Sequence, residues 1–143
     1  MAGVWFGVLA AVGALAAPSA FATLAAPVAG KFVGRLFELE AGLSLGMALL
    51  LFILERQRTR AATEEGTGPV FSTNLMLLLA TLFCTVAGYY AVVPMMEAAR
   101  AGQGRWSFGA LHAVSAGFFF ARCVLVLALA WRLSAFRTTA TPS

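Results

Sequence analysis

The sequence "GKFVGRLFELEAGLSLG" (residues 30–46) combines an apolar segment with a regular ladder of small residues. Glycine recurs at every fourth position, with one exception at Glu38, where a carboxylate takes its place. The ladder glycines are Gly30, Gly34, Gly42 and Gly46. Small residues at this spacing allow two membrane helices to approach closely. The segment therefore predicts a membrane helix packed against a neighbour, with a charged group in the contact surface.

The composition of the whole chain is that of a membrane protein. Of its 143 residues, 61% are hydrophobic and 11% are charged, and the mean hydropathy is +0.87. A soluble domain carries about 25% charged residues, and a membrane span needs about 20 apolar residues. Long uncharged runs therefore predict one all-α integral membrane domain over residues 1–143, an up-down bundle of four transmembrane helices. The expected spans are roughly 4–25, 28–54, 74–96 and 108–133, with a loop at 55–73.

The first predicted span has two features that need separate interpretation. Pro18 removes a backbone hydrogen bond and clashes with the preceding turn, so we expect a kink there. The sequence "GALAAPSAFA" (residues 13–22) ends in small residues, as a signal peptide does. Because no basic segment precedes it, we expect the first span to be retained, with cleavage as the alternative.

Basic residues flank the predicted spans and indicate how the chain lies in the membrane. The formal net charge is +4, from ten basic and six acidic residues. At span ends, basic side chains meet lipid headgroups and favour the cytoplasmic side, so we expect no nucleic-acid partner. Arg56, Arg58 and Arg60 place the 55–73 loop and both termini in the cytoplasm, with the spans crossing the inner (plasma) membrane.

Polar residues within the spans are expected at similar levels of the membrane. Counting about 1.5 Å per residue from the span ends places a group of them in the outer leaflet, with one Arg lower, near mid-membrane. These residues are Glu38, Glu40, Tyr89, His112, Ser115 and, below them, Arg122. Intramembrane charges are costly and mark functional sites. We expect this layer to line an outward-facing polar pocket, or to form a structural ion pair that fixes helix register.

The two carboxylates of this layer cannot share one helix face. Positions two apart on a helix differ by about 200°, so either Glu38 or Glu40 faces the bundle. We expect Arg122 to face the interior and to pair with one of them, with His112 as a second partner. The glycine ladder favours Glu38 as the inward residue, and the reverse assignment stays open.

The chain also carries soft side chains that bind metals in other proteins. The candidates are His112, Met95, Met96, Cys84 and Cys123. Thiolates, thioethers and imidazole suit soft metals such as Cu(I), but Met and Cys are also ordinary packing residues of apolar helices. Both interpretations stay open, and the sequence requires no cofactor. It has no Asp, one His and no hydrolase or phosphate-binding motif, so we expect no enzyme activity.

Three short motifs resemble a family of small four-span membrane proteins. Residues 17–21, "APSAF", resemble the motif at the end of the family's first span. The small-residue helix that follows is matched by Gly30, Gly34, Leu36 and Phe37, and the "LHxxS" motif by Leu111, His112 and Ser115. The family comprises the bacterial domain of unknown function 4149 and the eukaryotic transmembrane protein 205. Glu38 to Glu40 depart from its pattern, which often has tyrosines there, and Phe119 stands where Asn is common.

The resemblance implies the four-span fold and no assigned activity for the bacterial family. Through the eukaryotic relative it implies export of platinum drugs by sulfur ligands. Distant similarity to copper-resistance D-type proteins and to a haem-dependent protoporphyrinogen oxidase implies a role for membrane histidines. We therefore expect small-solute or metal-ion handling. The alternatives are a structural or interaction protein whose polar layer locks the bundle or docks a partner subunit or second copy, and a haem-binding redox subunit.

Overall fold

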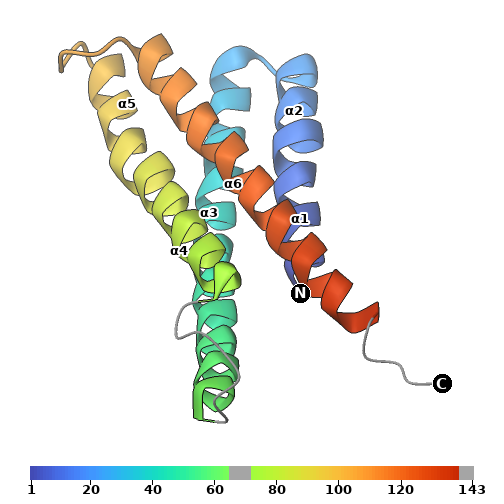
Figure 1. Cartoon of the computed structure of the whole chain (residues 1–143). Coiled ribbons are helices and arrows are strands. Elements are labelled where there is room, and N and C mark those ends of the chain that lie inside the picture. Colours follow the sequence, from blue (N-terminus) through green and yellow to red (C-terminus); the bar gives the residue numbers. More distant parts are fainter. Residues whose placement is uncertain (65–71, 139–143) are drawn as a thin grey trace.

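The computed structural model describes residues 1–64 and 72–138, and the regular structure of these ranges is helical (Figure 1). The elements are α1 (Ala2–Ala10), the π-helical η1 (Ala11–Ala16), α2 (Ala17–Thr23), α3 (Ala26–Glu64), α4 (Thr73–Thr85), the π-helical η2 (Val86–Ala91), α5 (Val92–Arg100) and α6 (Phe108–Thr138). Within the described residues, four helical segments are long and apolar enough to span a membrane, namely Ala2–Thr23, Ala26–Ala61, Thr73–Arg100 and Phe108–Ala135. The predicted all-α, four-span, multi-pass membrane protein is confirmed, and its environment is the lipid bilayer.

The four spans run alternately up and down and meet most closely in one half of the molecule (Figure 1). α6 packs against α1, α4 and α5, whereas α3 packs against α1, α2 and α4. The α2–α3 pair and the α5–α6 pair diverge towards the end that carries their connecting turns (Figure 1). The main hydrophobic core lies in the other half and includes Trp5, Leu9, Leu78, Val126 and Leu129. Polar residues between the diverging pairs and this core therefore lie near the middle of the bundle.

The buried side of α3 follows the helical period of 3.6 residues. Its buried residues include Ala29, Val33, Glu40, Ala41, Ser44, Ala48 and Leu51. Several of them are small, which brings the backbones of neighbouring helices close together. The small-residue contact surface of this helix is therefore formed by alanines and a serine.

The glycine ladder of α3 lies outside this contact surface. A Cβ atom added at Gly30, Gly34, Gly42 or Gly46 would meet no other atom within 4 Å. This corrects the expectation that a neighbouring helix of the bundle packs on the ladder. The reason is geometric: each step of four residues turns about 40° around a helix, so four steps turn about 160° and leave the original face.

Close helix contact occurs instead at two glycines in the π-helical segments. A Cβ on Gly13 of η1 would lie 2.5 Å from Cε1 of Phe119, and a Cβ on Gly88 of η2 would lie 2.6 Å from Cβ of Phe118. Both phenylalanines are on α6. Glycine at these two positions therefore lets η1 and η2 approach adjacent residues of α6.

The distortion expected at Pro18 takes the form of a π-helical segment. Pro18 lies in the first turn of α2, and η1 ends immediately before this helix. Because the proline ring clashes with the carbonyl group four residues earlier, it disfavours regular α-helical bonding over the preceding turn. The wider π-helical turn accommodates that conflict without ending the span.

The second span continues beyond its expected end. α3 has 39 residues and ends at Glu64, so residues 55–64 of the predicted 55–73 loop are helical. This segment contains Arg, Gln, Ala and Glu, all of which favour helix. At 1.5 Å per residue α3 is about 58 Å long, well above the roughly 30 Å of the hydrocarbon core, so its end projects from the membrane. Residues 65–71 of the predicted loop lie outside the described residues.

Candidate functional site

An ion pair between Glu40 and Arg122 lies at the centre of the candidate site. Glu40 is on the buried stripe of α3, and Arg122 is near the middle of α6. The Nη2 group of Arg122 donates to Oε2 of Glu40, and the two side chains are 5% and 2% exposed, respectively. Arg122 therefore faces the interior of the bundle, and its carboxylate partner is Glu40.

Hydrogen bonds extend this ion pair to the other two spans. Ser44 Oγ donates to Glu40 Oε1 at 2.5 Å, and Trp5 Nε1 donates to Ser44 Oγ at 2.9 Å. On the other side, Arg122 Nη1 donates to Thr85 Oγ1 at 3.4 Å. We call Trp5, Glu40, Ser44, Thr85 and Arg122 the central network. It takes at least one residue from each of the four spans.

The central network neutralises the two charges that it buries. A lone ion in a low-dielectric interior is strongly disfavoured, and a pair is tolerated when its remaining polar atoms are also satisfied. Each carboxylate oxygen of Glu40 accepts one of these bonds, and the guanidinium carbon of Arg122 lies 5.2 Å from the ring centroid of Phe119. Among the buried side-chain atoms of the described residues, Nε of Arg122 lacks a hydrogen-bond partner. The network is therefore closed except at this one N–H group.

The sequence pointed to part of this network only. Glu40 and Arg122 were candidates because charges are rare inside spans. Ser44 could have been added, since it is four residues after Glu40 and hence on the same helix face. Trp5 and Thr85 carry no comparable signal, because their partners lie on other helices and depend on how the helices pack.

Glu38 faces outward and belongs to a separate ion pair. Arg35 Nη1 donates to Glu38 Oε2 at 2.7 Å, and the two side chains are 64% and 53% exposed, respectively. This reverses the assignment of Glu38 as the inward carboxylate. That assignment rested on the glycine ladder, which turns away from the bundle, whereas Glu40 lies on the stripe that follows the helical period.

The remaining members of the predicted layer lie apart from the central network. Ser115 Oγ donates to the Gly88 carbonyl oxygen at 3.1 Å, which joins α6 to η2. Tyr89 packs edge-to-face on Tyr90, with ring centroids 5.1 Å apart. The predicted residues therefore do not line a single polar pocket.

His112 is exposed on α6 and belongs to a stack of aromatic and basic side chains. The ring centroids of His112 and Phe108 lie 5.9 Å apart. The guanidinium carbon of Arg100 lies 4.4 Å from the Phe108 ring centroid. Across the described part of the chain, no hydrogen bond or ion pair links His112 to a carboxylate. The expected second partner of the carboxylates is therefore absent from this arrangement.

A second polar network, which the sequence did not predict, joins three spans at the start of α4. Glu55 Oε1 accepts hydrogen bonds from Ser72 Oγ at 2.9 Å and from Asn74 Nδ2 at 3.0 Å. Arg132 Nε donates to Asn74 Oδ1 at 3.1 Å. We call Glu55, Ser72, Asn74 and Arg132 the boundary network. Ser72 also caps α4 by accepting from Leu75 N–H, a role that its sequence position could have suggested.

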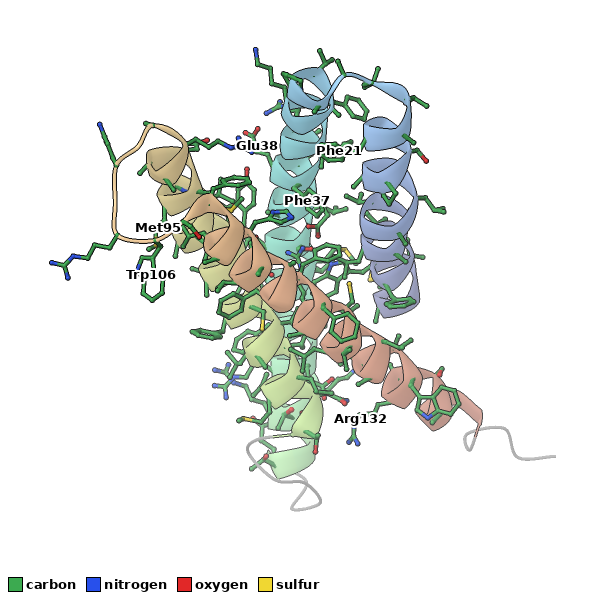
Figure 2. All side chains as sticks on the ribbon, turned by 90° about the horizontal axis from the view of Figure 1, so that it is seen from above. Phe21, Phe37, Glu38, Met95, Trp106 and Arg132 are labelled. Carbon is green, nitrogen blue, oxygen red and sulfur yellow. The ribbon has the colours of Figure 1, made fainter. Side chains whose placement is uncertain are left out.

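The metal-ligand candidates lie on three helices: Cys84 on α4, Met95 and Met96 on α5, and His112 and Cys123 on α6. Cys84 and Cys123 are free and partly buried, and Met95 is partly exposed. Figure 2 shows Met95 and Trp106 in the α5–α6 part of the molecule, apart from Phe37 and Glu38 on α3. In the residues that the structure describes, no group of three or more His, Cys, Asp or Glu side chains could hold a metal ion.

Comparison with known proteins identifies the family of the chain. The model of the family described as "Domain of unknown function (DUF4149)" matches residues 1–105. No curated protein and no solved structure matches the chain. The matched range contains Trp5, Glu40, Ser44 and Thr85, whereas Arg122 lies beyond it. Because the match covers well over half of its length, the chain belongs to the DUF4149 family.

Proposed function

We propose that this chain is a non-enzymatic structural component of the membrane, a four-span scaffold whose central network locks the spans in one arrangement. The observation that carries the proposal is the enclosed Glu40–Arg122 pair, together with its hydrogen bonds from the other two spans. Such a scaffold presents its outer surface to lipid and to a partner subunit or second copy.

Helices in lipid are held in one arrangement by packing and by polar contacts between them. Apolar burial gives little preference for one helix arrangement, because lipid tails are as apolar as the side chains. Close packing of small residues and hydrogen bonds between helices provide that preference instead. A helix that slid or rotated relative to the others would leave a charge or an indole N–H group without its partner. The central network therefore favours one register for all four spans.

The disposition of polar groups supports a structural role over catalysis. The charged groups of the central network point at one another, and two hollows at the molecular surface lie away from them, along the last turns of α3. A reactive site needs a charged or nucleophilic group that a substrate can reach. Glu40 and Arg122 are enclosed and already paired.

The proposal can be tested by the access of water-soluble reagents to the central network. In a cysteine-free background (Cys84→Ala, Cys123→Ala), Ser44→Cys places a thiol of similar size inside the network. A charged methanethiosulfonate reagent is expected to leave this thiol unmodified in the folded protein and to modify it after denaturation. Thr63→Cys, at the exposed end of α3, is the matched control and is expected to react in both states.

A second candidate function is the handling of a small solute, which one observation favours. Arg122 has a buried Nε–H group without a described partner, as a binding site for an anionic or hydrogen-bonding solute would have. In that case the central network would admit water, and the thiol of Ser44→Cys would react in the folded protein. The same labelling experiment therefore distinguishes a structural network that excludes water from a site that admits a solute.

The proposal also places the protein in the inner membrane, with the α3–α4 connection in the cytoplasm. Arg56, Arg58 and Arg60 form the densest group of basic residues, and such groups stay on the cytoplasmic side. In sealed spheroplasts, an impermeant thiol reagent is expected to modify Gln103→Cys, in the α5–α6 connection, and to leave Thr63→Cys unmodified. The opposite pattern would invert the orientation.

A further inference from the structure

The last turns of α3 present two basic side chains, Arg56 and Arg60, that have no partner among the residues that the structure describes. Arg56 and Arg60 are four residues apart, so they lie on the same face of the helix. Among the described residues, neither guanidinium group takes part in an ion pair or a hydrogen bond. Two adjacent positive charges repel each other, and this arrangement is stabilised when an anion binds between them.

Both arginines border the same two surface hollows. One hollow, of about 250 Å³, is lined by Arg56, Thr59, Arg60, Thr63 and Glu64. The other, of about 390 Å³, is lined by Phe52, Ile53, Arg56, Gln57 and Arg60. The arginines therefore stand between a polar hollow towards the end of α3 and a more apolar hollow towards its middle.

The position of these hollows matches the surface of the bilayer. Glu55 bonds to Asn74 in the first turn of α4, so the level of Glu55 is the level at which the third span begins. Arg56 and Arg60 lie at this level and just beyond it, whereas Phe52 and Ile53 lie on the membrane side. A lipid phosphate at the bilayer surface is therefore within reach of both guanidinium groups.

The polar hollow also defines the chemistry of the headgroup. Thr63 Oγ1 donates to the Thr59 carbonyl oxygen, and Thr59 Oγ1 donates to that of Glu55. Because Thr59 is buried, the exposed Thr63 hydroxyl is the one that keeps acceptor capacity towards a ligand. Glu64 adds another acceptor and a negative charge. A ligand that complements this hollow has one phosphodiester for the arginines and hydroxyl donors for the acceptors. A second phosphate on the headgroup would be repelled by Glu64.

We propose that Arg56 and Arg60 bind the phosphodiester of an anionic phospholipid with a hydroxyl-bearing headgroup, with its acyl chain along Phe52 and Ile53. Phosphatidylglycerol has this chemistry. The site is distinct from the central network and does not depend on the structural role proposed for it.

The experiment measures lipid retention by native mass spectrometry of the full-length protein in detergent with equal amounts of phosphatidylglycerol and phosphatidylcholine. Arg56→Gln/Arg60→Gln is expected to weaken the retention of phosphatidylglycerol by about thirtyfold, because two charges at the bilayer surface are lost. The control is Arg58→Gln/Arg105→Gln, which removes the same charge. Arg58 is about 200° around the helix from Arg56 and lines neither hollow, so this variant is expected to retain the lipid.

Three results would overturn the proposal. Equal loss in both double variants would mean that net charge alone attracts the lipid. Equal retention of phosphatidylcholine and phosphatidylglycerol by the wild-type protein would remove the preference for an anionic headgroup. Thermal stabilisation by inorganic phosphate equal to that by phosphatidylglycerol, and lost in Arg56→Gln/Arg60→Gln, would assign the site to free phosphate. A folded Arg56→Gln/Arg60→Gln protein is verified by an unchanged melting temperature in lipid-free detergent.

Discussion

Helix α3 carries two ion pairs whose carboxylates are only two residues apart, and their surroundings differ completely. Glu38 pairs with Arg35 on the same helix, and both side chains are largely exposed. Glu40 pairs with Arg122 from α6, and both are enclosed by the other spans. The two pairs contain the same chemical groups. The position of a carboxylate around the helix axis therefore determines whether its ion pair lies on the exposed surface of one helix or links two helices inside the bundle.

An ion pair within one helix and an ion pair between two helices differ in how much they stabilise the fold. A pair within one helix restrains only its own side chains, and exposure weakens its contribution to stability. A pair between α3 and α6 fixes two distant segments, and losing one partner leaves a buried charge uncompensated. Substitutions of enclosed residues are therefore expected to cost more stability than matched substitutions of exposed residues.

Arg122→Met is expected to destabilise the protein most. Removal of the guanidinium leaves the Glu40 carboxylate buried without its counterion, which costs about 3 kcal/mol. Glu38→Gln, which also breaks an ion pair of α3, is expected to leave the melting temperature unchanged. Thermal unfolding of both variants in the same detergent measures the contrast. Equal melting temperatures of the two variants would contradict the distinction between the pairs.

Gly88→Ala tests, without changing a charge, whether a substitution at a contact between helices costs more stability than one on the exposed surface. The new Cβ would lie 2.6 Å from Phe118 Cβ, so α6 or η2 must move, at a cost of about 1–3 kcal/mol. Gly42→Ala, on the exposed ladder, adds the same methyl group where nothing lies within 4 Å. Comparison of their unfolding temperatures should show a loss for Gly88→Ala alone. A comparable loss for Gly42→Ala would mean that the ladder is a contact surface.

Ser44→Ala is expected to weaken the central network without removing a charge. The substitution takes away the donor to Glu40 Oε1 and the acceptor for the Trp5 indole, which costs about 1–2 kcal/mol. The same variant combined with Trp5→Phe should lose less than the sum of the two single losses, because both act on one hydrogen bond. Strictly additive losses would argue against the Trp5–Ser44 bond.

Asn74→Ala is expected to have the smallest effect of these substitutions. The boundary network lies where α4 begins, so water can replace some of the hydrogen bonds that the Asn74 amide makes with Glu55 and Arg132. We expect a loss of about 1 kcal/mol, seen first as faster amide hydrogen exchange in the first turn of α4. Exchange that is faster around Glu40 than around Ser72 would contradict the separation of the two networks.

The sequence predicted the architecture because the fold of a membrane protein depends on quantities that a sequence displays directly. Long uncharged runs mark the spans, and a charge such as Arg122 within a run must face the interior. The ladder favours Glu38 over Glu40 wrongly, because positions at a strict four-residue spacing do not stay on one face of a long helix. The 3.6-residue period, followed through Ala41, Ser44 and Ala48, gives the observed orientation.

The rest of the candidate site depends on how helices pack, which a single sequence does not display. Trp5 meets Ser44, and Thr85 meets Arg122, across gaps of 39 and 37 positions in the chain. Gly13, in the π-helical segment ahead of Pro18, likewise lies close to Phe119 of another span. These contacts arise from the relative rotation and height of separate spans. The spacing of residues within one helix does not show how that helix is rotated and placed relative to the other spans.

The central claim is that Glu40 and Arg122 act as one structural unit, and a double-mutant cycle tests it most directly. Glu40→Gln and Arg122→Met each leave one charge unpaired, whereas the double variant leaves none and retains an acceptor for Ser44. Unfolding free energies of the wild-type, single and double variants should show that the double variant recovers most of the stability lost by either single change. Losses that simply add in the double variant would show that the two residues are not coupled, and would contradict the account.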